Sequence, residues 1–597
     1  MRVLVGWPEA PVDPAARIGS TANGAPVSFE SGSCWPTAMA ANGRLRVVLA
    51  GCIYNRAALA ATLTALEPGG RLDDAGVVLR LWEERGAALL AALRGAFAVA
   101  VWDARVRRLV LARDQLGLVP LYVTGERERL AASVSLPALL ALPGVSPAWD
   151  AVALDALLTL GAVPPPATAY LAIRQIGPGE SLVLEDGRPR LQRWWQLGVP
   201  ERAAARGDGA SAVHERLRES VRLRAGGVRT TLCLSGGLDA VAVLALAAAE
   251  RRAPPHAVTW SRVRDGELEA RLAAGAAVRA GVEHSLVEVE PDWAAALDAV
   301  LDLHGMPVPG FDVPYLGAAA QPGWRLLGGH GGEAVLGGSP PHREWVALTQ
   351  FRALPGPLRE LVQLCARLAP GGRMDALVTG TPLAALGCVQ RARRRLAPAA
   401  RADLYTPDAL AALGGRGSDD LLGALAADAV AAGADHPLDV IHHVTLQLAL
   451  QPLAALHLEA AGRGAELRLP LVDHRLAQVA LGVPPERRGS AWGRQLLLRI
   501  ALGRRLPRAV ARQASRRLAP APAAWTCEPL RGLVEDGLAP GHVAAAGVFQ
   551  PDTVSRLVAE HRAGRADHAE HLWSLIVVSR WLGRAGWPSA ASSRATG

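Results

Sequence analysis

Between residues 212 and 327, segments with helical spacing of apolar residues alternate with short apolar runs typical of strands. Helices are expected at 212–223, 239–251 and 267–280, and strands at 230–234, 257–261, 284–289 and 324–327. Consecutive parallel strands need a long crossover, which a helix provides, so this rhythm predicts a parallel sheet covered by helices. The pattern therefore requires a domain of the α/β class.

The first 200 residues have a different pattern, with short strands, turns and one or two helices. Apolar residues recur at helical intervals over 77–92, whereas 44–50, 97–102 and 108–112 are typical of strands. A Gly/Ala-rich stretch at 203–210 is the best candidate linker. We therefore expect two domains, residues 1–200 and 211–590, and a mostly helical region after about residue 345.

The composition excludes several classes of protein. Half of the residues are hydrophobic and 20% are charged, which argues for folded cores. The longest apolar run near a motif, 240–249, is shorter than the roughly 20 residues that a bilayer requires, and the N-terminal residues lack a signal peptide. Six scattered cysteines without a C-x-x-C pair indicate neither a disulfide framework nor a zinc site. We expect a soluble, cytoplasmic protein that binds no membrane.

The net charge is small for a chain of this length. There are 64 Lys+Arg against 55 Asp+Glu, a net charge of +9, and all of the basic residues are arginine because the sequence contains no lysine. No arginine run is interleaved with aromatic residues, so we expect no nucleic-acid partner.

The strongest local signal is Ser235-Gly-Gly-Leu-Asp239, between an expected strand and an apolar helix. The two glycines let the backbone turn tightly and approach a ligand, and the helix start offers free N–H groups and the positive end of its dipole. Ser235 adds a hydroxyl donor, and Asp239 could either cap the helix or hold a Mg²⁺ ion that bridges phosphates. An ordinary strand–turn–helix corner is the alternative that spacing alone leaves open.

This segment resembles the S-G-G-x-D-S pyrophosphate-binding loop of the N-type ATP pyrophosphatases, and in particular of the asparagine synthetase family. Members of that family use ATP to make an acyl-adenylate, release pyrophosphate and let an amine attack the adenylate. The resemblance implies ATP as cofactor, bound by the residues Ser235, Gly236, Gly237, Leu238, Asp239 and, in the next strand, Val258. Ala240 replaces the final serine of the motif, so one phosphate contact is missing.

A second segment, 326–338, reads L-L-G-G-H-G-G-E-A-V-L-G-G and resembles the family's L-S-G-x-G-x-D-E-L-F-G-G. Glycines this dense after a strand make a second backbone-lined loop that is able to face the first. The resemblance adds Gly328 and Gly329 to the ATP site and puts Glu333 where the family has a metal-binding Asp. Asp239 and Glu333 are therefore expected to hold Mg²⁺ together.

A third segment, 464–475, resembles the family's G-x-E-x-R-x-P-F-L-D-H-R and contains Glu466, Arg468 and Asp473. The resemblance assigns these residues to the wall or the support of the ATP site. A charged pair two residues apart in an apolar run needs partners if it is buried, so a core ion pair and a direct substrate role both remain open for Glu466 and Arg468.

Residues 73–122 also resemble this family, through L-R-G-A-F-A and R-D-Q-L-G-L-V-P-L-Y. The fold implied for residues 1–200 is the αββα sandwich of an Ntn-type, class II glutamine amidotransferase. Such a glutaminase needs a cysteine after the initiator Met, yet position 2 is Arg, and Cys34 would require the removal of 33 residues. Ala50-Gly51-Cys52 also replaces the family's Asn-Gly-Glu. We expect a degenerate domain that does not hydrolyse glutamine.

Family members without a working glutaminase include β-lactam synthetases and lasso-peptide cyclases, which use an intramolecular amine. His330 stands where the β-lactam enzymes carry a tyrosine that helps to deprotonate the amine, and a histidine suits that task at neutral pH, although it could simply hydrogen-bond within its loop. The β-lactam enzymes also use a lysine to stabilise charge during ring closure. In this chain Arg512 or Arg516 would have to do so, unless both lie on a solvated helix face.

The missing lysine and the long helical insertion at about 345–440 favour a lasso-peptide cyclase. Such an enzyme adenylates an Asp or Glu side chain of a small ribosomal core peptide and closes a macrolactam with the peptide's N-terminal amine. The partners implied are a precursor peptide, a leader peptidase and leader-recognition proteins. A β-lactam synthetase-like ligase, an ammonia-dependent asparagine synthetase-like ligase and an inactive scaffold of a biosynthetic complex are the alternatives.

Overall fold

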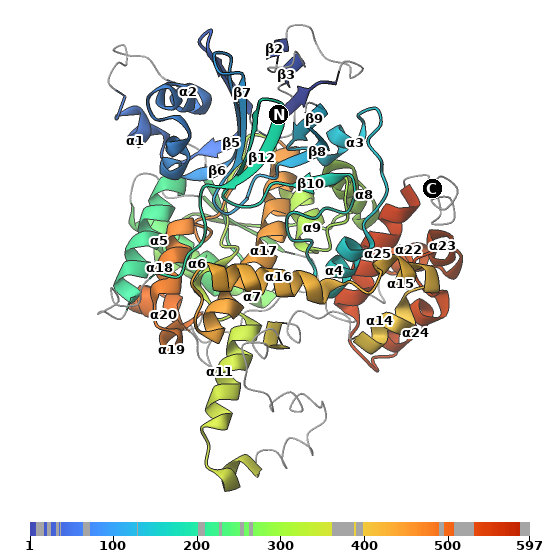
Figure 1. Ribbon diagram of the computed structural model, residues 1–597. Helices are drawn as coiled ribbons and strands as arrows, with labels where there is room; N and C mark the ends of the chain where they lie inside the picture. Colours follow the sequence, from blue (N-terminus) through green and yellow to red (C-terminus); the bar gives the residue numbers. More distant parts are fainter. Residues whose placement is uncertain are drawn as a thin grey trace.

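The computed structural model of the chain describes residues 1–7, 17–20, 26–30, 35, 37–63, 72–127, 129–200, 209–225, 230–250, 256–261, 267–360, 387–389, 398–488, 495–506 and 530–584. Cys34, Arg512, Arg516 and most of the expected linker lie outside these ranges. Figure 1 shows the N-terminal strands above a helix-rich body, with the last helices, α22 to α25, on one side.

The N-terminal half contains two six-stranded sheets in which all strand pairs are antiparallel. One sheet has the order β10-β8-β9-β1-β3-β2 and the other β12-β11-β7-β6-β5-β4. The strands are β1 (Arg2–Val5), β2 (Arg17–Ser20), β3 (Pro26–Glu30), β4 (Thr37–Ala41), β5 (Leu45–Ile53), β6 (Gly95–Asp103), β7 (Arg108–Arg113), β8 (Tyr122–Glu126), β9 (Arg129–Ser133), β10 (Ile173–Gln175), β11 (Glu180–Glu185) and β12 (Arg188–Arg193).

Alternating side chains make these sheets the inner layers of a sandwich. In β5, Val48 and Ala50 enter the core between the sheets, whereas Val47 and Leu49 pack with α2 (Asp74–Arg85). On the far side, α3 (Leu136–Leu140) and α4 (Ala151–Leu160) pack with Leu4 and Ala131. The expected αββα sandwich is therefore confirmed.

The expectation of one helix over 77–92 was wrong in its second half. Asp73 caps α2 by accepting a hydrogen bond from the Gly76 N–H, and α2 ends where Gly86 adopts φ 55°. The chain then continues as the 3₁₀ helix η2 (Gly86–Ala92), so the apolar spacing persists although the α-helix does not. The short helix α1 (Arg56–Ala60) precedes α2.

The second half is built on a five-stranded parallel sheet in the order β15-β14-β13-β16-β17. Its strands are β13 (Thr230–Cys233), β14 (His256–Ser261), β15 (His284–Glu288), β16 (Arg325–Leu327) and β17 (Glu466–Arg468). The helices before and between the first four strands are α5 (Ala210–Ala225), α6 (Leu238–Ala249), α7 (Glu267–Ala280), α8 (Trp293–His304) and α9 (Asp312–Ala319). This confirms the parallel sheet. β17 was not expected, because two of its three residues, Glu466 and Arg468, are charged and leave no apolar run to detect.

The remaining chain is mostly helical, as expected. Its helices are α10 (Gly332–Leu336), α11 (Pro340–Arg352), α14 (Pro398–Leu404), α15 (Pro407–Leu413), α16 (Ser418–Ala431), α17 (Pro437–Gly462), α18 (His474–Gly482), α19 (Pro485–Arg488), α20 (Leu496–Leu502), η4 (Gly503–Arg505), α22 (Leu530–Gly537), α23 (Pro540–Ala546), α24 (Pro551–Arg562) and α25 (Ala569–Arg584). Among the helices of the described ranges, none has the length and apolarity needed to cross a bilayer.

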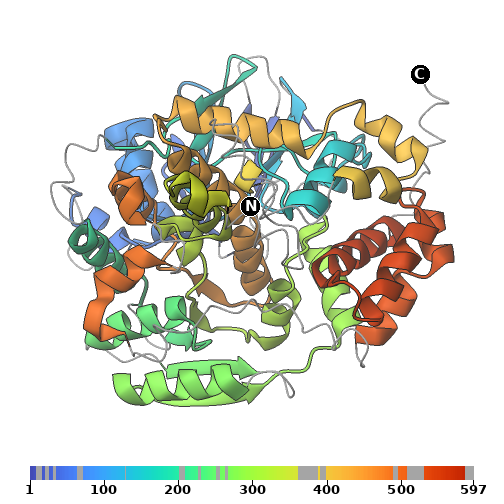
Figure 2. The same cartoon turned by 90° about the horizontal axis from the view of Figure 1, so that it is seen from below.

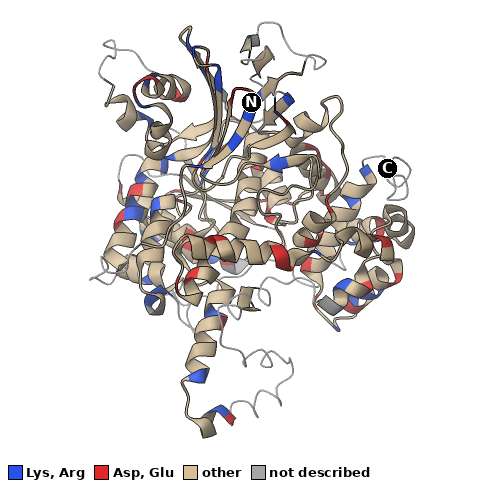
Figure 3. Cartoon of the chain, in the orientation of Figure 1, with Lys and Arg blue, Asp and Glu red and all other residues tan. Residues whose placement is uncertain are grey.

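The two halves share their hydrophobic cores. One cluster joins Val3 and Ala98 to Leu232 and Leu467, and another joins Leu4 to Trp573. The view from below in Figure 2 shows α17 in the middle of the molecule, with α7 and its neighbouring strand at one edge. In the ribbon of Figure 3, the positions of basic and acidic residues are interspersed along the described elements. The N-terminal sandwich and the parallel-sheet domain are thus packed as one body.

Candidate active site

The first glycine loop follows β13 at the carboxyl end of the parallel sheet. Gly236 has φ 71°, and a Cβ atom there would lie 2.5 Å from the Glu269 carbonyl oxygen, so only glycine fits this turn. Gly237 then occupies the N-cap position of α6, where it has no side chain to cap the first turn. The exposed Ser235 precedes it, and Leu238 is buried. The free N–H groups of this turn are suited to an anionic ligand.

The neighbouring strand supports this loop from the side. Val258 of β14 is buried, and its carbonyl oxygen accepts a hydrogen bond of 2.8 Å from the Leu234 N–H. The hydrogen bond extends the β13–β14 pairing to the residue before Ser235. Val258 therefore lies beside the loop, as its expected place in the ATP site requires.

The second glycine loop follows β16 and packs directly on the first. The Gly328 N–H donates to the Arg468 carbonyl oxygen at 2.9 Å, which continues the sheet into the loop. A Cβ atom on Gly329 would lie 2.6 Å from the Cα of Ala240, and one on Gly332 would lie 2.6 Å from the Cγ of Asp239. The two loops meet at a distance that only glycine allows, which confirms the expectation that they face each other.

The meeting point places two carboxylates together. Burial and the negative charge of Glu333 raise the pKa of Asp239 to about 8, although a hydrogen bond from Gln495 Nε2, 2.5 Å from Asp239 Oδ1, opposes the shift. Glu333 lies in the first turn of α10. Gln495 has φ 50° and precedes α20, and it was missed in the sequence because no motif links it to a residue 256 positions away.

The carboxylate pair fits Mg²⁺. Within the part of the chain that the structure describes, no three or more His, Cys, Asp or Glu residues are grouped to hold a metal by themselves. Mg²⁺ is commonly held by one or two carboxylates together with the phosphates of a substrate. A divalent cation between Asp239 and Glu333 would also relieve the repulsion that raises the pKa of Asp239.

His330 lies in the second loop between the two halves of the glycine run. Burial lowers the pKa of its imidazole, and the nearby charge of Asp312 at the start of α9 partly opposes this shift. Nδ1 of His330 is buried without a hydrogen-bond partner among the described residues. The imidazole is therefore neutral near pH 7, with a ring nitrogen that can accept a proton.

The third motif forms β17, next to β16, and supports the second loop. Glu466 accepts hydrogen bonds from Arg468 Nε at 2.7 Å and from Arg325 Nε at 3.0 Å. Although burial opposes the shift, Arg468 and Arg325 together lower the pKa of Glu466. Arg468 also donates to the Arg224 carbonyl oxygen at 2.9 Å. The structure thus places Glu466 and Arg468 in an ion-pair network.

Asp473 joins the same motif to α5. It accepts a hydrogen bond from the Arg475 N–H as the N-cap of α18, and its Oδ2 lies 3.0 Å from Arg224 Nη1. Both side chains are buried, with 5% of Arg224 and 2% of Asp473 exposed. Burial would raise the pKa of Asp473, but the charge of Arg224, with His474 and Arg475, lowers it.

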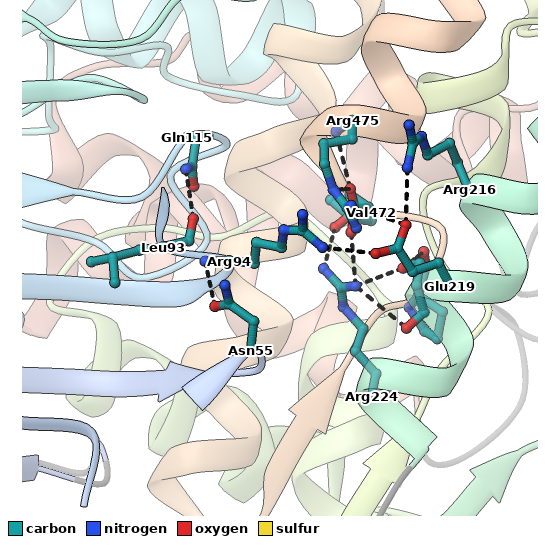
Figure 4. A network of polar contacts seen from close by, with 12 residues as sticks. Asn55, Leu93, Arg94, Gln115, Arg216, Glu219, Arg224, Val472 and Arg475 are labelled. Atoms are coloured by element: carbon teal, nitrogen blue, oxygen red, sulfur yellow. Dashed lines mark hydrogen bonds and ion pairs between the residues drawn. The ribbon is translucent and has the colours of Figure 1, made fainter. Parts of the chain in front are cut away.

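Polar contacts also connect this motif to the N-terminal sandwich (Figure 4). Arg94 Nη1 lies 2.8 Å from Glu219 Oε1, and Glu219 also accepts hydrogen bonds from Arg216 and Arg475 at 3.0 Å each. Asn55 orders the loop before Arg94 by accepting from its N–H at 3.0 Å. These contacts fix α5 and α18 against the sandwich.

The segment that contains Cys52, expected from the sequence to differ from a working glutaminase, lies at this junction. Cys52 Sγ is 3.8 Å from Arg468 Nη2, and the guanidinium groups of Arg224 and Arg468 lie over the Tyr54 ring at 4.5 and 5.4 Å. Burial, with the charge of Glu466, raises the pKa of the Cys52 thiol to about 12, so the thiol is protonated. A cavity of about 20 Å³, enough for one water molecule, separates Cys52 from His457 of α17.

Two family models match the chain in separate halves. Residues 212–583 match the model for asparagine synthase, and residues 31–195 match that for a glutamine amidotransferase domain. The chain belongs to the asparagine synthase family. These enzymes are ATP-dependent, amide-forming ligases, and the matched halves coincide with the parallel-sheet domain and the sandwich.

Individual relatives agree with this assignment. A putative glutamine-hydrolyzing asparagine synthetase of Mycobacterium tuberculosis is 31% identical over 322 residues, which cover 50% of this chain and 48% of the relative. The carboxyethyl-arginine beta-lactam-synthase of Streptomyces clavuligerus is 30% identical over 312 residues, which cover 50% of this chain and 56% of that protein. The chain thus matches about half the length of these curated relatives.

Proposed function

We propose that the protein is a ligase that activates a carboxylate with ATP as an acyl-adenylate and transfers the acyl group to an amine. The observation that carries the proposal is the contact between the two glycine loops at Asp239, which brings the start of α6 and a carboxylate pair together. Backbone N–H groups at the start of α6 would hold phosphate oxygens, and Ser235 would add a hydroxyl donor. When bound, Mg²⁺ would neutralise phosphate charge, with Asp239 and Glu333 as its protein ligands.

The proposed reaction has two steps, adenylation of the carboxylate and transfer of the acyl group to the amine. A carboxylate oxygen of the substrate attacks the α-phosphorus of ATP, and the bond from that phosphorus to the bridging oxygen breaks, releasing pyrophosphate. An amine nitrogen then attacks the acyl carbon, the bond to the AMP oxygen breaks, and an amide forms. The amine must lose a proton, and neutral His330 would accept it at its unpartnered nitrogen, with Asp312 favouring the imidazolium that results.

For the substrate we propose a small ribosomal core peptide, whose Asp or Glu side chain is activated and whose N-terminal amine closes the ring, as in lasso-peptide cyclases. Support comes from the sandwich, where Ala50 and Cys52 replace the Asn and Glu of a working glutaminase, so that ammonia from glutamine is not the nucleophile. A leader peptidase and a leader-recognition protein would act with the enzyme. Arg512 and Arg516 remain proposed for charge stabilisation in place of a lysine.

The similarity to the carboxyethyl-arginine beta-lactam-synthase favours a second candidate, closure of a smaller ring by an amine within one small molecule. An incubation with ATP and Mg²⁺ separates these candidates. A core peptide should yield AMP, pyrophosphate and a product lighter by one water, whereas a β-amino acid substrate would give the small ring. Formation of ADP instead of AMP would refute the adenylate. Asparagine from aspartate and ammonia would identify an ammonia-dependent ligase, and tight MgATP binding without AMP from any substrate would favour a scaffold.

A further inference from the structure

Behind the second glycine loop lies a polar cluster, the loop-anchoring cluster, that the proposed reaction does not use. It consists of buried side chains from three helices: Asp439 and His442 of α17, Arg488 of α19, and His342 of α11 with its neighbour Ser339. Each is at most 3% exposed. A buried ion pair with histidines is costly to desolvate, and apolar side chains of similar volume would fill the space at a lower cost. The cluster therefore calls for a role other than stability.

The hydrogen bonds of the cluster define the tautomer of His442. Arg488 Nη1 is 3.3 Å from His442 Nδ1, and since a guanidinium only donates, Nδ1 is the acceptor. The proton of the neutral ring is then on Nε2, which donates to the Val335 carbonyl oxygen at 2.9 Å. Asp439 in turn forms an ion pair with Arg488. The cluster thus directs one N–H group at the backbone of α10.

α10 packs on the core through Ala334, Val335 and Leu336 but makes few backbone hydrogen bonds of its own. α10 contains five residues, Gly332–Leu336, which is too short for a helix to be stable without external contacts. Gly337 and Gly338, with φ 80° and 90°, end it at once, and its last carbonyl groups have no partner within the helix. His442 provides that partner at Val335, two residues after Glu333. This contact therefore adds a directed hydrogen bond to the core packing of the turn that carries Glu333.

We infer that His442 is a positioning residue that holds the turn carrying Glu333 in place beside Asp239, with Arg488 and Asp439 fixing its tautomer. The inference rests on the proposed function, because it requires Asp239 and Glu333 to share a cation. A packing contact leaves a short turn free to slide, whereas a hydrogen bond from a ring of defined tautomer fixes both distance and direction.

The test measures Mn²⁺ binding by electron paramagnetic resonance in the presence of a non-hydrolysable ATP analogue. His442→Leu should weaken Mn²⁺ binding about tenfold, the range found for residues that orient metal ligands. His442→Gln should restore it, because the glutamine amide can donate to Val335 and accept from Arg488. His443→Leu is the matched control: it removes an equally buried histidine of α17, 3% exposed, which faces Asp428 and Arg193 instead of α10.

Two results would overturn the inference: wild-type Mn²⁺ affinity in His442→Leu, or an equal loss in His443→Leu. If His442→Leu does not fold, His442→Asn takes its place, because asparagine keeps a polar group but is too short to reach Val335, and it should lose Mn²⁺ affinity where His442→Gln does not. Absence of nucleotide-dependent Mn²⁺ binding in the wild-type protein would refute the proposed function itself. Normal wild-type binding with an insensitive His442→Leu would refute only the role of His442.

Discussion

Gly332→Ala tests whether the two glycine loops create the metal and phosphate site, because the added methyl group would fall on the carboxylate of Asp239. The new Cβ would lie 2.6 Å from Asp239 Cγ, whereas carbon atoms in contact lie roughly 3.5 Å apart. The carboxylate must therefore move by about 1 Å. A misplacement of that size in a reacting geometry lowers the reaction rate on the order of 100-fold. We expect MgATP binding, measured by isothermal titration calorimetry, to weaken at least tenfold while the melting temperature changes little, because a side-chain carboxylate can rotate away.

Two matched glycines make the result interpretable. Gly329→Ala meets the backbone of Ala240 instead of a mobile side chain, with 2.6 Å between the new Cβ and Cα, and should cost roughly 1–3 kcal/mol of stability as well as MgATP affinity. Gly275→Ala lies at an exposed position of α7 with nothing within 4 Å of the new Cβ, and should leave binding unchanged. Wild-type MgATP affinity in Gly332→Ala would show that the carboxylate of Asp239 does not take part in the site.

Three further predictions concern stability. Arg224→Met should destabilise the fold by about 3 kcal/mol, because it removes the ion pair at 3.0 Å from the buried Asp473 carboxylate and leaves it, among the described residues, only the contacts of Arg475; chemical denaturation would show this, and the double variant Arg224→Met/Asp473→Leu should recover part of the loss. Burial and the charge of Arg488 lower the pKa of His442 to about 3. As the pH falls below about 6.5, His442 therefore binds a proton in the unfolded chain but not in the folded one, which favours unfolding. At pH 5 the free energy of unfolding of the wild type should have fallen by about 2 kcal/mol more than that of His442→Gln. An equal pH slope for the two would contradict this, as His342, Asp439 and His443 are common to both. Tyr54→Leu should lower the melting temperature by removing the ring under Arg224 and Arg468, a cation–π contribution of about 1–2 kcal/mol, whereas Tyr54→Phe should retain it.

The features that could be predicted from the sequence are those that depend on residues close together in the chain. The glycines of both loops signal tight backbone turns wherever they occur after a strand, and the alternation of strands and helices sets the parallel sheet. Asp239 and Glu333 come together because the carboxyl ends of neighbouring strands β13 and β16 meet at one edge of the sheet.

The contacts that were not predicted join residues far apart in the chain. Gln495 reaches Asp239 from a segment whose sequence has no polar periodicity, and His442 is one polar residue in a helix that is buried nearly all round. Apolar spacing specifies which face of a helix is covered, but in a helix covered on all sides it does not indicate which polar residue contacts which neighbour. The break at Gly86 shows the converse case, in which apolar spacing continued past the end of an α-helix.

The sandwich carries Ala50 and Cys52 where the family resemblance predicts the Asn and Glu of a working glutaminase, and the contacts of Cys52 suggest a structural role for this segment. Where the family has a glutamate, Cys52 presents a protonated thiol to Arg468 and lies beside Glu466. A carboxylate at position 52 would face Glu466 in a buried place and compete for the same arginine, whereas the neutral thiol leaves the Glu466–Arg468 pair intact. Arg468 belongs to β17, whose backbone extends the sheet to Gly328. The altered segment, which we propose no longer binds glutamine, supports through β17 the loop that carries His330 and Glu333.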